Sequence, residues 1–134
     1  MGYALTTTVD QPFEQVLAAT RSALADQGFG VLTEIDLADT LKARIGAEIP
    51  PQVILGACRP PLAHAAVTAE PSIGLLLPCN VVIRALKDGE TLVEALDPTV
   101  MVTMTGNPAL TEVATEAREL LTNALVSLDG TLAR

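Results

Sequence analysis

The chain has 134 residues, of which 49% are hydrophobic and 18% charged, and its formal net charge at pH 7 is −8. This length fits a single domain covering residues 1–134, and the apolar content excludes a disordered chain. The acidic balance argues against nucleic acid and against an anionic membrane surface as partners, because both carry negative charge.

The chain contains no stretch that resembles a membrane span. The longest candidate, Ile73 to Ile83, falls short of the roughly 18 apolar residues that a span needs, and Pro78 and Asn80 interrupt it. The N-terminal residues lack the basic start and the apolar core of a secretory signal. We therefore expect a cytoplasmic protein in which Cys58 and Cys79 are reduced thiols.

The chain begins with a predicted strand followed by a helix. Gly2 to Val9 alternates weakly and ends in threonines, which suits a first strand. Asp10 offers an N-cap, Pro12 suits the first helical turn, and Gly28 can end the helix in the left-handed conformation. The apolar face of this helix comprises Phe13, Val16, Leu17, Ala23 and Leu24.

A second strand and a short helix follow. Gly30 to Ile35 is apolar enough for a strand, and Asp36 can cap a helix that Gly46 ends. Gln52 to Cys58 comes directly after two prolines and is a continuous apolar run, which predicts a central strand. The apolar positions of the short helix are Leu37, Leu41 and Ile45.

The middle of the chain predicts a third helix and then a hairpin. Adjacent prolines suit the first turn of a helix from Pro60 to about Ala69. Asn80 to Leu86 and Thr91 to Leu96 predict two strands, and Asp88-Gly89 between them is a strong hairpin signal. Neither strand alternates cleanly between apolar and polar residues, so the register stays open.

The C-terminal part predicts one long helix. Val100 to Thr105 suits a short strand or an irregular edge, while Asn107 and Pro108 suit the cap and first position of the last helix, which Gly130 ends. The predicted order is β-α-β-α-β-α-β-β-α, which indicates an α+β domain with helices packed on one face of an antiparallel sheet. The broad apolar stripe of the last helix comprises Leu110, Val113, Ala114, Ala117, Leu120, Leu121, Ala124, Leu125 and Leu128.

Several sequence blocks occur in an order that is typical of one family. These blocks are Gly28–Asp36, Ile54–Cys58, Pro60–His64, Ala69–Pro71, Ile73–Val82 and Ala95–Pro98. The series resembles the bacterial and archaeal DUF302 family from about Thr8 to Leu128. The resemblance implies an α+β domain whose antiparallel sheet holds a long helix, similar to the TATA-box-binding-protein-like fold group, and it implies a homodimer. It carries no agreed reaction, and fold likeness alone implies no DNA binding.

One position departs from that family. Arg59 stands where these proteins usually carry Asn after the first cysteine. A site that depended on this Asn would be altered or absent in the present chain.

The two cysteines and the single histidine are the candidates for chemistry. Cys58 ends a predicted strand just before a helix N-terminus, where the partial positive charge and the neighbouring Arg59 favour a thiolate. His64 lies on the first or second turn of the same helix, and Cys79 begins the next strand. Cys79 approaches Cys58 if the two strands are neighbours in the sheet.

Three interpretations of these residues stay open. In the first, both cysteines are small buried hydrophobes with His64 hydrogen-bonded nearby, in a structural or interaction domain without a ligand. In the second, Cys58, His64 and Cys79 bind a small ligand or a metal such as zinc, with Glu70, water or a residue of a second subunit completing four ligands. In the third, Cys58 is the nucleophile of a thiol-dependent enzyme and His64 is its base.

The aliphatic content of two segments favours self-association. Val53 to Ala57 and Leu75 to Leu77 carry more aliphatic surface than two exposed strands tolerate. Part of this surface belongs in the core, and part suits an isologous interface. We therefore expect a homodimer.

Overall fold

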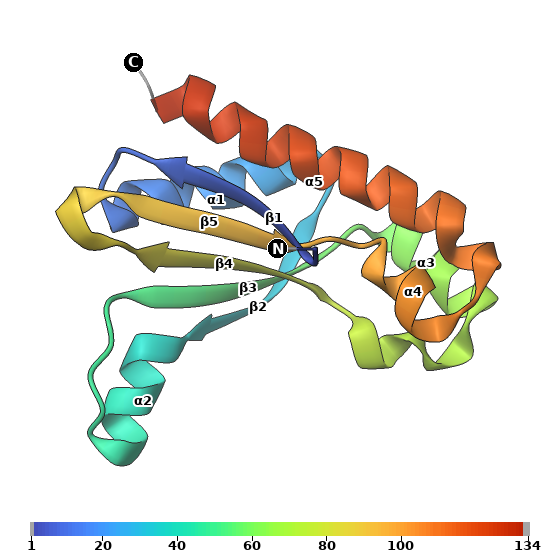
Figure 1. Cartoon of the computed structure of the whole chain (residues 1–134), viewed down its shortest axis with the longest axis horizontal. Helices are drawn as coiled ribbons and strands as arrows, with labels where there is room; N and C mark the ends of the chain where they lie inside the picture. Colours follow the sequence, from blue (N-terminus) through green and yellow to red (C-terminus); the bar gives the residue numbers. More distant parts are fainter. Residues whose placement is uncertain (1, 133–134) are drawn as a thin grey trace.

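A five-stranded antiparallel sheet forms the centre of the computed structural model, which describes residues 2–132 (Figure 1). Its strands lie in the order β1-β5-β4-β3-β2, so β4 occupies the middle and β3 is an interior strand beside the edge strand β2. The hairpin of β4 and β5 is confirmed, since Ala85 pairs with Thr91 next to the turn. The strands are Ala4–Val9 (β1), Gly30–Asp36 (β2), Gln52–Cys58 (β3), Cys79–Ala85 (β4) and Thr91–Leu96 (β5).

Five α-helices connect and flank the strands, and the predicted order of strands and helices is confirmed with one short helix added. Short 3-10 turns cover Pro71–Leu76, Lys87–Gly89 and Pro108–Leu110. Within the described part of the chain, no helix has the length and apolar content needed to cross a membrane. The helices are Phe13–Asp26 (α1), Leu37–Ile45 (α2), Pro60–Ala69 (α3), Val100–Thr105 (α4) and Thr111–Leu132 (α5).

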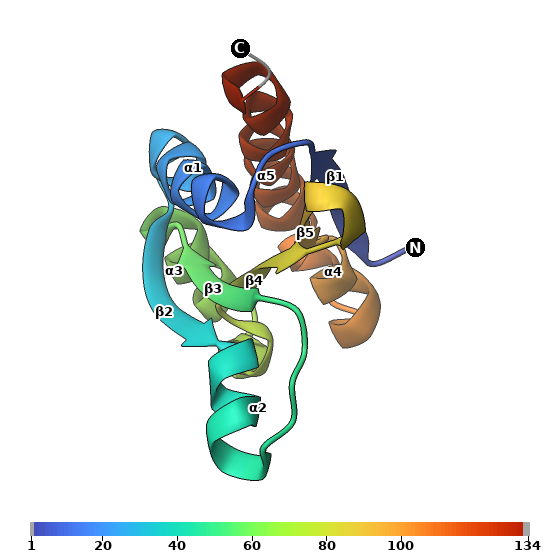
Figure 2. The ribbon, with the colours of Figure 1, turned by 90° about the vertical axis from the view of Figure 1, so that its left-hand side faces the viewer.

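Helices α1 and α5 lie against each other on one face of the sheet, which we call the covered face (Figures 1 and 2). Alternate residues of the strands point into this layer, and burying one such aliphatic side chain stabilises the fold by about 1.5–3 kcal/mol. The main core therefore lies between these two helices and the sheet. Its fully buried side chains include Val16, Leu55, Val81, Ile83 and Val93.

A second, smaller core lies beyond the end of the sheet. It joins α3, the turn that follows it, α4 and the start of α5. This cluster fixes α3 directly after β3 and therefore fixes the surroundings of both cysteines. Its buried members are Ala66, Ile73, Met101, Leu110 and Ala114.

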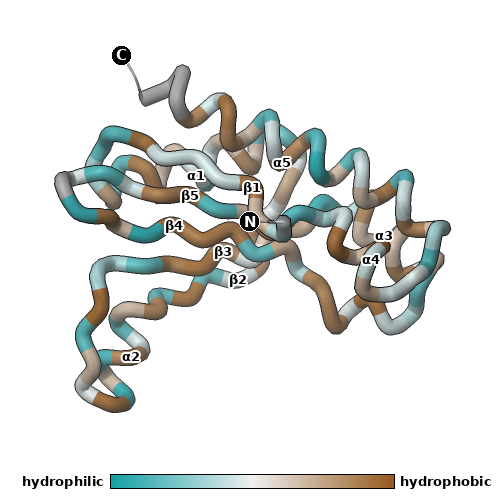
Figure 3. Tube along the Cα trace, viewed as in Figure 1, coloured by the Kyte–Doolittle hydropathy of each residue, from teal (hydrophilic) through white to brown (hydrophobic). Residues whose placement is uncertain are grey.

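Strand β2 and helix α2 form the exposed margin of the molecule. Every residue of β2 is exposed, and α2 buries none of its side chains and projects away from the sheet (Figure 2). The carboxylate of Asp36 accepts a hydrogen bond from the Asp39 N–H at 2.9 Å, and Gly46 ends α2 with a φ of 69°, as predicted. Figure 3 shows hydrophobic residues in α2 as well as along the strands.

The start of the first helix differs from the prediction. Helix α1 begins at Phe13, and Pro12 rather than Asp10 is its N-cap. The Pro12 carbonyl accepts the first helical hydrogen bond, from the Val16 N–H at 3.1 Å. Proline suits this position because it lacks an N–H and keeps φ near the value it has here, −63°.

The segment Val100–Thr105 is a helix, so the prediction of a strand or irregular edge was wrong. The carbonyl of Asp97 accepts from the Val100 N–H at 3.0 Å, and its carboxylate accepts from the Thr99 N–H at the same distance. These two bonds start a helical turn despite the β-branched residues that follow, and Gly106 ends it with a φ of 67°. Local capping has overridden strand propensity.

The last helix also differs at both ends. Asn107 caps the short turn Pro108–Leu110 through a bond from the Ala109 N–H to its side-chain oxygen at 2.9 Å, and α5 itself begins at Thr111. Helix α5 continues through Gly130 to its last residue, Leu132. A glycine inside a helix costs only about 1 kcal/mol, so Gly130 alone does not end it.

Candidate thiol site at the end of the sheet

The sheet brings the two cysteines together. Cys58 is the last residue of β3, Cys79 is the first residue of β4, and Ala57 pairs directly with Cys79 across these neighbouring strands. Cys58 and Cys79 are thus one residue out of register, so their Cα atoms lie about 6 Å apart. Because side chains alternate along a strand, the thiol of Cys79 points to the covered face and that of Cys58 to the opposite face. Both are free thiols and both are half-buried.

The two cysteines line one small cavity of about 30 Å³. A volume of this size accommodates about one water molecule and is far below the several hundred cubic ångströms of an ordinary ligand pocket. Its walls are mostly apolar and come from five different segments of the chain. They include Phe29, Leu62, Ala66, Met101 and Ala117.

Burial controls the protonation of Cys79. Removal of the thiol from water raises the pKa of Cys79 above its ordinary value, and the neighbouring Cys58 raises it further. A thiolate at this position is disfavoured because neither water nor a close partner stabilises the charge. Cys79 therefore remains a protonated thiol at neutral pH.

His64 lies on the outer side of α3, away from the cavity. Leu62, Ala63 and Ala66 face the cavity, and at 3.6 residues per turn His64 is rotated by about 150° from them. The residue is exposed, and its carbonyl accepts a hydrogen bond from the hydroxyl of Thr68 at 2.8 Å. The imidazole does not join the two thiols.

Glu70 lies at the other end of α3 and has a structural contact. Helix α3 separates it from Cys58 by about 15 Å, given 1.5 Å per residue. Its carboxylate accepts from the Asn107 side-chain amide at 2.9 Å, and the same amide nitrogen donates to the carbonyl of Ala69 at 3.1 Å. Glu70 therefore fastens the end of α3 to the turn before α5.

These positions do not fit the predicted zinc site. Among residues 2–132, no group of three or more His, Cys, Asp or Glu side chains lies close enough to hold a metal ion. Zinc prefers four N, S or O ligands in a tetrahedron. Cys58 and Cys79 are neighbours in the sheet but point to its opposite faces, and His64 and Glu70 lie outside the cavity that the two cysteines line.

Arg59 supplies the positive charge at the cavity. It is the N-cap of α3 and lines the cavity, its Nε donates to the carbonyl of Gln27 at 3.2 Å, and its Nη1 lies 3.6 Å from Glu116 Oε2. A Cβ added to Gly28 would lie 2.9 Å from this Nε, so Gly28 also makes room for the guanidinium. The side chain is held in place on two sides.

Met101 is a residue that the sequence did not single out. It is 5% exposed and comes from α4, the segment predicted as a strand or irregular edge. Nothing in the spacing between Cys79 and Met101 connects them, because the second core brings α4 and the sheet together through long-range packing. The sequence around Met101 therefore carries no signal that connects it with the two cysteines.

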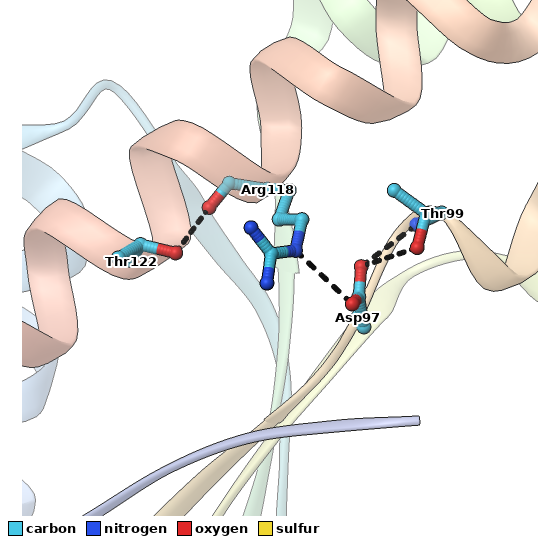
Figure 4. Close-up of polar contacts among 4 residues, drawn as sticks. All are labelled: Asp97, Thr99, Arg118 and Thr122. Atoms are coloured by element: carbon cyan, nitrogen blue, oxygen red, sulfur yellow. Dashed lines mark hydrogen bonds and ion pairs between the residues drawn. The ribbon is translucent and has the colours of Figure 1, made fainter. Parts of the chain in front are cut away.

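A second polar cluster is structural (Figure 4). Partial burial tends to raise the pKa of Asp97, but hydrogen bonds from the backbone and hydroxyl of Thr99 and from Arg118 outweigh it, so the pKa of Asp97 is lowered. The Arg118 Nε–Asp97 Oδ2 distance is 3.1 Å, and the Thr122 hydroxyl donates to the Arg118 carbonyl at 2.7 Å. These contacts join the end of β5 to α5.

The fold and the thiol-lined end of its sheet define a small α+β domain, and comparison with known proteins places that domain in a family. The sequence profile described as "Domain of unknown function DUF302" matches residues 5–128, so the chain belongs to the DUF302 family. No curated protein matches the chain. A crystal structure described as an uncharacterized conserved protein DUF302 from Bacillus stearothermophilus is similar, with 28% sequence identity and a TM-score of 0.86 over 94% of this chain and 98% of that one.

Proposed function

We propose that this DUF302 domain is a homodimeric interaction domain, in which a second copy packs on the open face of the sheet, opposite α1 and α5. The observation that supports this proposal is an aliphatic stripe on that face. Ile35, Ile54 and Val82 are neighbours in register across β2, β3 and β4, and all three point away from the covered face. Leu96 extends the apolar surface onto β5, whereas Leu92, on the same face, is already buried.

The charges of the open face suit a second copy. Two charged side chains of β4 and β5 lie on it, Arg84 and Glu94, and they pair with an Nε–Oε1 distance of 3.6 Å. An apolar face whose charges are paired can meet an identical face despite the formal net charge of −8. A strongly charged partner would find little there to complement.

The size of the face is also compatible with a specific interface. Five strands about 4.8 Å apart and about six residues long present roughly 500 Å² per copy. Two copies therefore bury about 1,000 Å², the lower limit for a biological interface. A hollow of about 240 Å³ on the same face, lined by Tyr3, Val82 and Leu96, offers a place for side chains of the partner.

Light scattering and sedimentation of the purified chain test the proposal. We expect a dimer at tens of micromolar and a monomer for Val82→Arg, which places a cation in the middle of the stripe. Val126→Arg is the matched control, because Val126 is 67% exposed on α5, away from the sheet face. Ile35→Arg, at an exposed edge position, provides a second disrupting variant if Val82→Arg affects folding.

A monomeric wild-type chain from micromolar to millimolar concentration would contradict the proposal. A dimer that persists in both stripe variants, with folding verified by circular dichroism, would place the interface elsewhere. A dimer lost in Val126→Arg alone would assign it to the outer surface of α5.

The ligand-binding and enzymatic interpretations have narrower support. Of the four residues in the predicted binding module, Cys58, His64, Cys79 and Glu70, only the two cysteines line a common cavity. That cavity is too small for an organic ligand. A thiol enzyme that uses Cys58 with His64 as base lacks the required proximity, since the imidazole lies on the far side of α3.

A further inference from the structure

We propose that the outer edge of β1 and the neighbouring helix α5 form a groove for the free C-terminal tail of a partner protein, which adds to the five-stranded sheet as a further strand. A hollow of about 450 Å³ lies between these two elements, and its size is that of an ordinary ligand pocket. This inference is independent of the proposed dimer, because the groove lies beside α5 and not on the open-face stripe. The residues that line it include Leu5, Thr6, Arg118, Thr122 and Leu125.

The main chain of β1 is unpaired along its outer side. Among residues 2–132, β5 is the only strand that pairs with β1, and the Asp97 N–H donates to the Tyr3 carbonyl at 2.8 Å. Because main-chain hydrogen bonds alternate along an antiparallel pair, the N–H and C=O groups of Ala4, Thr6 and Thr8 point outward. Thr6 lines the groove although its side chain points to the open face, so the groove reaches this outer edge.

The two edges of the sheet differ in how they are protected. Strand β2 has a register shift between Val31 and Thr33 and carries two carboxylates, Glu34 and Asp36. Irregularities and charges of this kind prevent an edge from pairing with another strand. Strand β1 has the sequence Ala-Leu-Thr-Thr-Thr-Val, without a charge, a proline or a register shift. The edge of β1 is therefore the one that accepts a strand.

The direction of α5 determines which end of the added strand meets a positive charge. Arg118 bonds to Asp97, whose main chain bonds to Tyr3, so Arg118 lies beside the start of β1. Strand β1 and helix α5 run in the same direction (Figure 1). A tail that pairs antiparallel with β1, the slightly more stable arrangement, therefore ends beside Arg118. From Arg118 to Leu125 the helix spans about 10 Å, the length of about three extended residues.

Arg118 has the chemistry to bind the carboxylate at that end. Its side chain is half exposed, its Nε donates to Asp97 at 3.1 Å, and Figure 4 shows its two Nη atoms apart from that bond. The guanidinium carries further N–H donors in a planar fork that fits a carboxylate. Leu5 and Leu125 give the groove apolar walls, which suit aliphatic side chains at alternate positions of the tail.

Fluorescence anisotropy with two synthetic tails tests the proposal on the full chain. The probe is fluorescein-labelled Lys-Lys-Thr-Val-Thr-Val with a free C-terminus, and the comparison is the same peptide with a C-terminal amide. Its lysines suit the formal net charge of −8. We expect the free acid to bind about 10- to 100-fold more tightly than the amide, the range for a hydrogen bond to a charged group.

N-methylated peptides test the added strand itself. Two versions of the free acid carry N-methyl groups on alternate amides, in opposite phases. Only every second N–H of an added strand faces β1, so one version should lose binding and the other should keep it. Equal binding by both versions would contradict pairing with the edge of β1.

Arg118→Gln separates recognition of the carboxylate from structural support. It should weaken binding of the free acid to the level of the amide and leave binding of the amide nearly unchanged, whereas a structural loss would weaken both alike. Arg118→Lys should keep part of the preference for the free acid. Arg44→Gln is the matched control, because it removes the same charge from an exposed position on α2, and it should keep the full preference.

Absence of binding up to millimolar concentration, or equal affinity for acid and amide, would overturn the proposal. Dissociation of a dimer by the free acid would assign the groove to a second copy and would overturn it as well. Light scattering on the same samples keeps the two proposals apart, because a chain that dimerises without binding either peptide refutes only the groove. If Arg118→Gln fails to fold, judged by circular dichroism, the two N-methylated peptides still decide with the wild type.

Discussion

On the covered face of the sheet, Val81 and Ile83 are fully buried against the helical layer, whereas Ile54 and Val82 on the open face are only half-buried. Helices α1 and α5 both lie on the covered side of the sheet (Figure 2). An antiparallel sheet with one face in water usually alternates apolar and polar residues. Strand β4 instead reads Val81-Val82-Ile83, with apolar side chains on both faces. The open face therefore has the apolar composition of a protein interior, although α1 and α5 do not cover it.

The strongest test of this comparison replaces one isoleucine on each face. Ile83→Ala should lower the free energy of unfolding by about 2–5 kcal/mol, because it leaves a cavity in the covered core. Ile54→Ala should lower the free energy of unfolding by less than half as much, because water already reaches part of the Ile54 side chain. Both variants are compared at nanomolar protein concentration, where the chain is expected to be monomeric. Urea denaturation gives both values.

The same pair of variants also reports on association. If a second copy covers the open face, the loss in free energy of unfolding caused by Ile54→Ala should increase with protein concentration. The loss caused by Ile83→Ala should depend less on concentration, because Ile83 lies on the covered face. Equal losses for both variants at every concentration would remove the distinction between the two faces.

The Gly56→Ala substitution tests how tightly the open face is packed near the cysteines. A Cβ at Gly56 would collide with the hydroxyl of Thr33 and would lie 2.7 Å from Pro78 Cγ. Gly56→Ala should therefore destabilise the fold by about 1–3 kcal/mol through overpacking. Gly74→Ala is the control, since an added Cβ there meets nothing within 4 Å, and its thermal unfolding should stay close to that of the wild type.

The fold was largely predictable because its signals are local. Asp36 and Gly46 cap the two ends of α2 through hydrogen bonds to residues three or four positions away. The Asp88-Gly89 turn makes β4 and β5 neighbours in the sheet. The proximity of Cys58 and Cys79 followed from the same reasoning, once their strands proved to be neighbours.

The remaining part of the site depended on information that is not local. His64 was excluded from the cavity by the rotation of α3, which the second core determines, and Met101 entered it because α4 packs against the end of the sheet. The Asp97 cap that makes α4 helical is visible in the sequence only after Val100–Thr105 is known to turn rather than extend. Tertiary packing decided each of these outcomes, and strand propensity pointed the other way.

Asp97 tests how firmly the helical layer is attached to β5. Its pKa is lowered from the ordinary value of 3.8 in the folded state, so it stabilises the fold above that pH, and the contribution disappears as pH falls through the lowered pKa. Asp97→Asn should cost about 1–2 kcal/mol at pH 7, because it weakens the bonds from Thr99 and Arg118.

The pH dependence distinguishes this explanation from a general packing effect. The stability difference between wild type and Asp97→Asn should narrow as the pH decreases below about 4. Asp26→Asn, at the exposed end of α1, is the control for the loss of one carboxylate and should leave the free energy of unfolding at pH 7 close to that of the wild type. A difference that stays constant down to pH 2 would mean that the charge of Asp97 contributes nothing to stability.

The smallest expected effect concerns the contact between the helical layer and the exposed edge strand. Arg21 on α1 meets Glu34 on β2 through two bonds, with Nε–Oε1 at 3.1 Å and Nη2–Oε2 at 2.6 Å, and both side chains are exposed. Because water and salt screen such pairs, Arg21→Ala should lower stability by only about 0.2–1 kcal/mol and by less in 1 M NaCl. Arg21→Lys keeps the charge but loses the fork, so its loss should be smaller still. A loss well above 1 kcal/mol that salt does not reduce would show that β2 is held to the covered layer, and that the margin of the sheet is less independent than its exposure indicates.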